Sequence, residues 1–149
     1  MPCSTLRFES LLPAFSMTKI LCRYEGDLHC LAEHSLSGVE IHTDAPLDHD
    51  GLGESFSPTD LLATALGTCI LTVMGITAKR RGWNLGEVRA DVEKIMTLEG
   101  PRRIDALEVY LTMPDGLTDD QLSLLRKVVD TCPVKRNLEP SININLFWA

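Results

Sequence analysis

Several features that mark common functional classes are scarce or missing in this chain of 149 residues. Aromatic residues make up only 5% of it, which leaves no aromatic platform on which a ligand could stack. No glycine-rich phosphate loop follows a predicted strand, and no Gly-x-Ser-x-Gly motif occurs. Nucleotide binding and serine hydrolysis therefore have no support in the sequence.

Positive charge is also scarce. The chain has 14 lysines and arginines against 21 acidic residues, giving a net charge of −7 that a phosphate backbone would repel. The one compact basic cluster, residues 79–81, lies where a helix is predicted to end and complements the helix dipole there. Apolar residues form no run of the roughly 20 that a bilayer requires. We expect neither a nucleic-acid partner nor a membrane span.

Cysteine is too sparse for a disulfide framework. The five cysteines are an odd number spread over a mid-sized chain, which favours the reducing cytoplasm. Residues 1–16 lack the basic start and continuous apolar stretch of a secretory signal. We expect them to be an N-terminal extension, either disordered or an artefact of the assigned start, followed by one domain over residues 17–149.

Metal-binding motifs are likewise missing. The histidines and nearby cysteines show no paired Cys-x-x-Cys or His-x-x-x-His spacing, and strand alternation sends several of them to opposite faces. These residues are Cys22, His29, Cys30, His34, His42 and His49. Residues 48–51 (DHDG) lack the remaining ligands of a calcium loop. We interpret the histidines as surface residues and expect no metal and no cofactor.

What the chain does contain is a block pattern of strands and helices. Three strands are predicted over residues 19–43, then a loop over 44–56 and a helix from residue 58 to about 80. A hairpin follows over 88–95 and 104–111, then a helix from Thr118 to about Thr131, a further helical turn over 134–138 and a strand over 141–148. The order βββ-α-ββ-α-β favours an α+β fold with antiparallel sheets.

The first predicted helix has the clearest local signals. Ser57 is a typical N-cap, Pro58 suits the first helical position, and Asp60 completes a capping box. The next 18 residues contain almost no charge, so we expect a central helix that is buried on nearly all sides. We place one apolar face on Leu62, Ala65, Leu66, Cys69, Val73 and Ile76.

Two cysteines occupy different kinds of position. Cys69 lies on an apolar helix face, where a free cysteine usually packs as a small hydrophobe. Cys132 directly precedes Pro133, which disfavours helical geometry at the residue before it. Backbone amides at the start of the next turn, together with Lys135 and Arg136, are expected to lower the pKa of the Cys132 thiol.

Taken together, these segments resemble the OsmC/Ohr family of osmotically inducible and organic hydroperoxide resistance proteins. The motifs that carry the resemblance are residues 57–62 (SPTDLL), 63–69 (ATALGTC) and 132–138 (CPVKRNL). The resemblance implies an intertwined homodimer of curved antiparallel sheets around two central helices. It also implies that Cys69 attacks an organic hydroperoxide and Cys132 resolves the sulfenic acid to a disulfide, which an external thiol or dithiol reopens without a cofactor.

The sequence departs from the active hydroperoxide reductases of that family. Those proteins place a glutamate directly after the proline of the helix start and an arginine in the N-terminal strand region. Here Thr59 follows the proline, Asp60 has a structural role as a cap, and Arg23 is the nearest basic candidate. These differences indicate a divergent OsmC-like subfamily. Two alternatives to peroxidase chemistry stay open: a non-enzymatic protein that binds a small ligand or senses redox state, and cysteines that serve only for packing.

Overall fold

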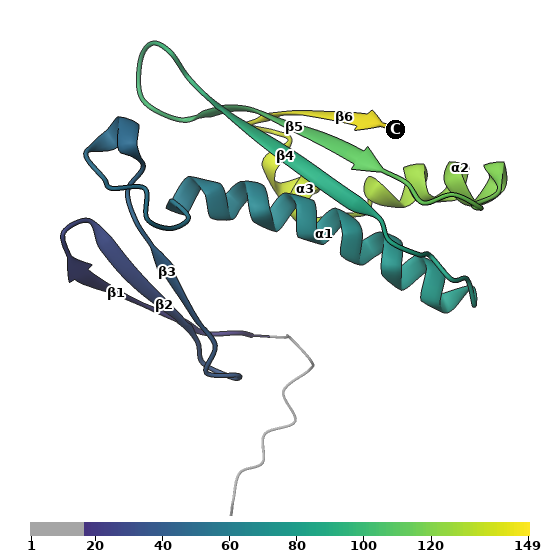
Figure 1. Ribbon diagram of the computed structural model, residues 1–149, viewed down its shortest axis with the longest axis horizontal. Coiled ribbons are helices and arrows are strands. Elements are labelled where there is room, and N and C mark those ends of the chain that lie inside the picture. The colour runs from purple at the N-terminus through teal and green to yellow at the C-terminus, as the bar shows by residue number, and fades with distance from the viewer. Residues whose placement is uncertain (1–16) are drawn as a thin grey trace, which may run out of the picture.

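The computed structural model describes residues 17–149, which fold into two three-stranded sheets and three α-helices (Figure 1). The α+β fold class and the predicted order of elements are confirmed. The prediction for residues 1–16 lies outside the described residues.

The first sheet is an antiparallel meander made of β1, β2 and β3, which span Ile20–Gly26, His29–His34 and Glu40–Thr43. A two-residue turn joins β1 to β2, and both of its residues, Asp27 and Leu28, have a positive φ. A loop with one short 3-10 turn, η1 (Leu47–His49), leads from β3 to the first helix.

This first sheet lies apart from the rest of the chain (Figure 1). Because side chains alternate along a strand, Tyr24 and Ile41 share one face, whereas Arg23 and His42 share the other. The first face is mainly apolar and open to solvent: Tyr24 is 67% exposed and Ile41 45%. A sheet of this kind needs a second layer that the single chain does not supply.

Helix α1 (Pro58–Arg80) begins as predicted. The Ser57 hydroxyl accepts a hydrogen bond from the Asp60 amide at 3.1 Å, and the Asp60 carboxylate accepts one from the Ser57 amide at 2.8 Å. Together these bonds satisfy two amides that the first helical turn would otherwise leave unpaired. The capping box is confirmed.

The predicted burial of α1 on nearly all sides is wrong for the single chain. One stripe faces the core, whereas Leu62 and Ile76 on the other side are 38% and 43% exposed. A helix that is apolar all round gives no sequence signal of which side will be covered. The buried side chains are Ala63, Leu66, Ile70, Met74 and Ala78.

Among the described residues α1 is the one helix long and apolar enough to span a membrane by length and composition, a test that core helices of soluble proteins also pass. In the fold it packs on β4 and against two further helices.

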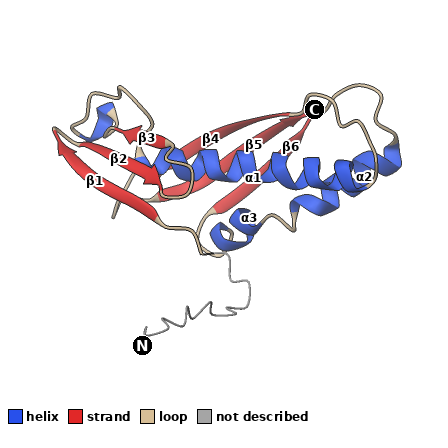
Figure 2. Cartoon of the chain, turned by 90° about the horizontal axis from the view of Figure 1, so that it is seen from below, coloured by secondary structure: helices blue, strands red, loops and turns tan. Residues whose placement is uncertain are grey.

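The second sheet has the order β4-β5-β6, with β5 at its centre, and α1 lies across it (Figure 2). Its strands span Arg89–Met96, Ile104–Thr112 and Asn143–Trp148. At Gly67 a Cβ atom would approach Cγ2 of Val92 to 2.9 Å, so a glycine allows the helix to lie this close to β4.

The last strand corrects one detail of the predicted topology. Strands β4 and β5 pair antiparallel as expected, but β6 pairs parallel to β5. Helices α2 (Asp119–Val129) and α3 (Pro133–Leu138) connect the two strands. Such a helical crossover returns the chain to the end of the sheet where β5 began, and this produces parallel pairing.

Candidate functional site

The two cysteines come together although they are far apart in sequence. Cys69 is half-buried in the middle of α1, and Cys132 is the fully buried N-cap of α3. Both are free thiols, and Cys69 lies close enough to Cys132 to influence its ionisation through a hydrogen bond and through charge. This pairing depends on α3 docking against α1.

The pKa of the Cys132 thiol is raised, which corrects the sequence prediction. Burial is the main cause, and the neighbouring Cys69 thiol adds to it. The Lys135 amide donates to Sγ of Cys132 at 3.4 Å and favours the thiolate, but it does not outweigh burial. Cys132 therefore stays protonated at neutral pH.

The side chains of Lys135 and Arg136 do not lower the pKa of Cys132, because both are engaged elsewhere. Nζ of Lys135 donates to the carboxylate of Asp130 at 3.0 Å and also to that of Glu139. Nε of Arg136 donates to the carbonyl of Asp130 at 3.0 Å. Their charges are used to hold α3 against the end of α2 and do not activate the sulfur.

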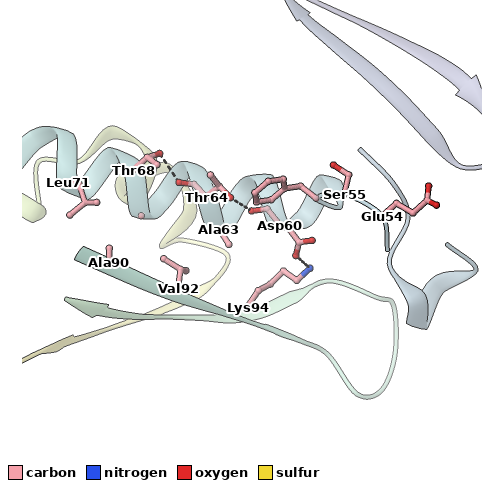
Figure 3. A pocket seen from close by; sticks show the side chains of 12 residues that line it. Glu54, Ser55, Asp60, Ala63, Thr64, Thr68, Leu71, Ala90, Val92 and Lys94 are labelled. Carbon is pink, nitrogen blue, oxygen red and sulfur yellow. Dashed lines mark hydrogen bonds and ion pairs between the residues drawn. The ribbon is translucent and has the colours of Figure 1, made fainter. Parts of the chain in front are cut away.

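A groove of about 860 Å³ runs along a different side of α1, between that helix and β4 (Figure 3). Its walls are mainly apolar, with charged groups at one end. Neither cysteine lines it. The lining residues are Glu54, Ser55, Phe56, Asp60, Ala63, Thr64, Gly67, Thr68, Leu71, Ala90, Val92 and Lys94.

The charged end of the groove contains Asp60, one of the predicted supporting residues, and Thr59, another, lies beside it. Nζ of Lys94 in β4 donates to Oδ1 of Asp60 at 2.5 Å (Figure 3). It also donates to Oγ1 of Thr59 at 2.8 Å. Burial opposes ionisation of Asp60, but the bonds from Lys94 and Ser57 outweigh it and lower the pKa of the carboxyl. Asp60 is thus both a cap and an ion-pair partner.

Lys94 is the residue that sequence reasoning missed here. Alternation along β4 points Ala90, Val92, Lys94 and Met96 inward, whereas Ile95 is 41% exposed. A lysine in phase with the apolar side of a strand was the available signal, because a charge at such a position requires a partner.

The structure does not bring Arg23 to either cysteine within one chain. It lies in β1, in the sheet that stands apart from α1, on the face opposite the exposed apolar one (Figure 1). Of the three predicted supporting residues, Thr59 and Asp60 therefore share a site and Arg23 does not join them.

One cluster of possible metal ligands was not expected. Within the described part of the chain, His29, Asp44 and Glu54 are the histidine and acidic side chains whose ligand atoms all lie within 4.8 Å of one another. The cluster contains neither cysteine. His29 was interpreted as an ordinary surface residue, but its side chain is only 28% exposed.

Comparisons with known proteins point to one family. The model of the family described as OsmC-like protein matches residues 49–147. A crystal structure from Psychrobacter arcticus 273-4, of a protein assigned to osmotic stress induction and detoxification response, is 36% identical. It covers 94% of this chain and 100% of its own, with a TM-score of 0.80. No curated protein matches the chain.

More distant structures share the fold alone. An organic hydroperoxide resistance protein OsmC from Legionella pneumophila is 14% identical over 92% of this chain and 99% of its own, with a TM-score of 0.74. One from Vibrio cholerae, with captopril in one of its active sites, is 15% identical over 93% and 95%, with a TM-score of 0.72.

Proposed function

This chain belongs to the family of OsmC-like proteins, and we propose that it is a cytoplasmic thiol peroxidase that reduces organic hydroperoxides in defence against oxidative stress. The observation that carries the proposal is the proximity of Cys69 on α1 to the buried Cys132 at the start of α3, since the two helices pack together and Cys69 influences the pKa of Cys132. Relatives named for hydroperoxide resistance share the fold and support the same chemistry.

The reaction uses the two thiols in sequence. The Cys69 thiolate attacks the distal peroxide oxygen, the O–O bond breaks, and the alcohol leaves after taking a proton. Cys132 then attacks the sulfenic acid on Cys69, an S–S bond forms, and water leaves. An external dithiol reduces that disulfide and is itself oxidised to a disulfide. No metal or flavin is needed for these steps.

The raised pKa of Cys132 suits the second role. A protonated Cys132 is a poor nucleophile toward peroxide but can donate a hydrogen bond to the sulfur or oxygen of an oxidised Cys69. Its full burial also protects it from direct oxidation. Cys69, which is only half-buried, is the thiol that a substrate can reach.

Turnover of cumene hydroperoxide with dithiothreitol or dihydrolipoamide tests the proposal. Cys69→Ser should abolish turnover, and Cys132→Ser should allow sulfenic acid formation without the intramolecular disulfide. Cys30→Ser is the matched control, since Cys30 is also partly buried but lies in the first sheet. Mass spectrometry after one equivalent of peroxide should show loss of two hydrogens and a Cys69–Cys132 disulfide. Full activity in Cys69→Ser would overturn the proposal.

We further propose that the protein acts as a homodimer. The uncovered side of α1, with Leu62 and Ile76 exposed, and the open apolar face of the first sheet are both surfaces that a second copy could cover. The resemblance to the family implies the same assembly. Cys69 lies on α1 between these exposed positions, so a partner would enclose the reactive thiol.

A second candidate function rests on the groove. Its mainly apolar walls and volume of about 860 Å³ suit a small apolar ligand. Neither cysteine lines the groove, so a ligand could bind there without any thiol chemistry. Asp60 and Lys94 neutralise each other, which favours an uncharged ligand. A ligand that survives purification and is identified by mass spectrometry, together with no peroxide consumption, would favour this function over the first.

A further inference from the structure

Beyond the thiols, the side chains of His29, Asp44 and Glu54 converge from two parts of the chain. His29 is the first residue of β2, and the other two lie at the start and near the end of the loop between β3 and α1. Asp44 is fully buried, Glu54 is 63% exposed, and in Figure 3 the Glu54 side chain points away from the groove.

One oxygen of Asp44 has no hydrogen-bond partner. Its Oδ2 accepts from the amides of Leu52 at 3.1 Å and Glu54 at 3.0 Å. Its Oδ1 is, among residues 17–149, the only buried side-chain nitrogen or oxygen left unsatisfied. A buried carboxylate oxygen without a hydrogen bond is costly, and a ligand that satisfies it would stabilise the fold.

The loop is built to hold Asp44 in this state. At Gly51 a Cβ atom would lie 1.7 Å from the carbonyl oxygen of Ala45, so only glycine lets the chain fold back closely enough to direct the two amides at the carboxylate. Both amides donate to Oδ2 of Asp44. Its Oδ1 is directed at the ring of His29, 3.7 Å from Nε2.

His29 is held as a metal ligand usually is. Its Nδ1 is 2.8 Å from the carbonyl oxygen of Asp27, and an N–H there would fix the tautomer and leave the Nε2 lone pair free. That Nε2 lies 3.2 Å from Oε2 of Glu54.

Two of the three separations suit a tetrahedral ion. Nitrogen and oxygen ligands about 2.0 to 2.1 Å from a common zinc ion lie about 3.3 Å from one another. The two measured separations from Nε2, 3.2 and 3.7 Å, bracket that value, and the third separation is within 4.8 Å. The exposed Glu54 side chain can close this remaining gap.

We propose that His29, Asp44 and Glu54 form a site for a divalent transition-metal ion, of which zinc fits best, with the fourth position open to water. One imidazole and two carboxylates are ligands that zinc and its neighbours accept. The ion would tie β2 to the loop that leads into α1. It takes no part in the thiol chemistry, so this site stands or fails independently of the proposed peroxidase activity.

The test uses the full chain with Co²⁺ and Zn²⁺. We expect one equivalent of Co²⁺ per chain, with a visible spectrum of nitrogen and oxygen ligation and no thiolate charge-transfer band. Zn²⁺ should displace it and raise the melting temperature. His29→Gln and Glu54→Gln should each weaken Co²⁺ binding at least tenfold and remove the thermal shift.

The matched control is His42→Gln. Nδ1 of His42 also lies near a carboxylate, 3.6 Å from Oε2 of Glu25, but no buried unpaired oxygen is beside it, so this variant should bind as the wild type does. Asp44→Asn tests the buried ligand, and circular dichroism would show whether that variant folds. No binding up to millimolar Co²⁺, a thiolate spectrum, or equal binding in His29→Gln would overturn the proposal.

Discussion

Replacing Asp60 separates the two things its carboxylate does in the structure. Asp60→Ala removes both the bond from the Ser57 amide at 2.8 Å and the ion pair with Lys94 at 2.5 Å. Asp60→Asn keeps an oxygen that can accept from Ser57 but removes the charge. Neither change touches Cys69 or Cys132, so both variants test the view that Asp60 is structural and not catalytic.

The expected magnitudes follow from the two contacts. Loss of a helix cap costs about 1 kcal/mol. A hydrogen bond between charged groups contributes roughly 1.5 to 3 kcal/mol when buried, but the Asp60 side chain is 40% exposed, so solvent screening reduces this to about 1 kcal/mol. We therefore expect Asp60→Asn to lose about 1 kcal/mol of unfolding free energy and Asp60→Ala about 2.

Urea denaturation at neutral pH measures both values. A double-mutant cycle of Asp60→Asn and Lys94→Met should give a coupling free energy of about 1 kcal/mol between the two side chains. Lys94 is only 15% exposed, and in Asp60→Asn it keeps its bond to Thr59. The pKa of Asp60 is lowered from 3.8, so its stabilising effect is present above that pH and is lost as the pH falls through the folded value. Wild type and Asp60→Asn should converge in acid.

The rate of peroxide consumption per folded molecule tests whether Asp60 takes part in the reaction. If Asp60 acts only as a cap and ion-pair partner, Asp60→Asn should consume hydroperoxide at the wild-type rate at a urea concentration where both are fully folded. A rate tenfold lower with unchanged stability would refute the reasoning and assign Asp60 to the reaction.

Three further predictions test the packing, the buried thiol and the assembly. Gly67→Ala should cost about 1 to 3 kcal/mol through its contact with Val92, and Val92→Ala should restore much of this in the double variant, as measured by urea denaturation. The raised pKa of Cys132 means that stability should fall as the pH rises above the ordinary thiol value of 9.0 toward the folded one, and less so in Cys132→Ala. If the proposed homodimer forms, Tyr24→Glu, on the open apolar face, should dissociate it in light scattering, whereas Arg23→Glu on the opposite face should not.

Local signals in the sequence predicted much of the fold. The capping boxes at Ser57 and Thr118 set the starts of α1 and α2, because the residues that form them are three apart and act within one turn. The hairpin of β4 and β5 followed from alternation and its turn residues. The family resemblance, which carried the cysteine roles, came from motifs around those same helix starts.

What the sequence could not supply depends on contacts between distant segments. The parallel pairing of β6 depends on where α2 and α3 carry the chain, and the covered side of α1 depends on which elements reach it. The cluster of His29, Asp44 and Glu54 has no regular spacing, since a hairpin turn and a folded loop bring its members together. Spacing rules find metal sites on single elements and miss sites assembled in this way.

The raised pKa of Cys132 bears most directly on the order of events at the thiols. Sequence position before a proline, with two basic residues following, favoured an activated Cys132, which would have made it a second candidate nucleophile. Burial and the adjacent Cys69 thiol reverse that expectation, and Lys135 is engaged by Asp130 and Glu139. A protonated, enclosed thiol cannot meet a peroxide first but is well placed to meet a sulfenic acid on its neighbour. The proposal that Cys69 attacks and Cys132 resolves, first implied by the family resemblance, is compatible with the raised pKa of Cys132.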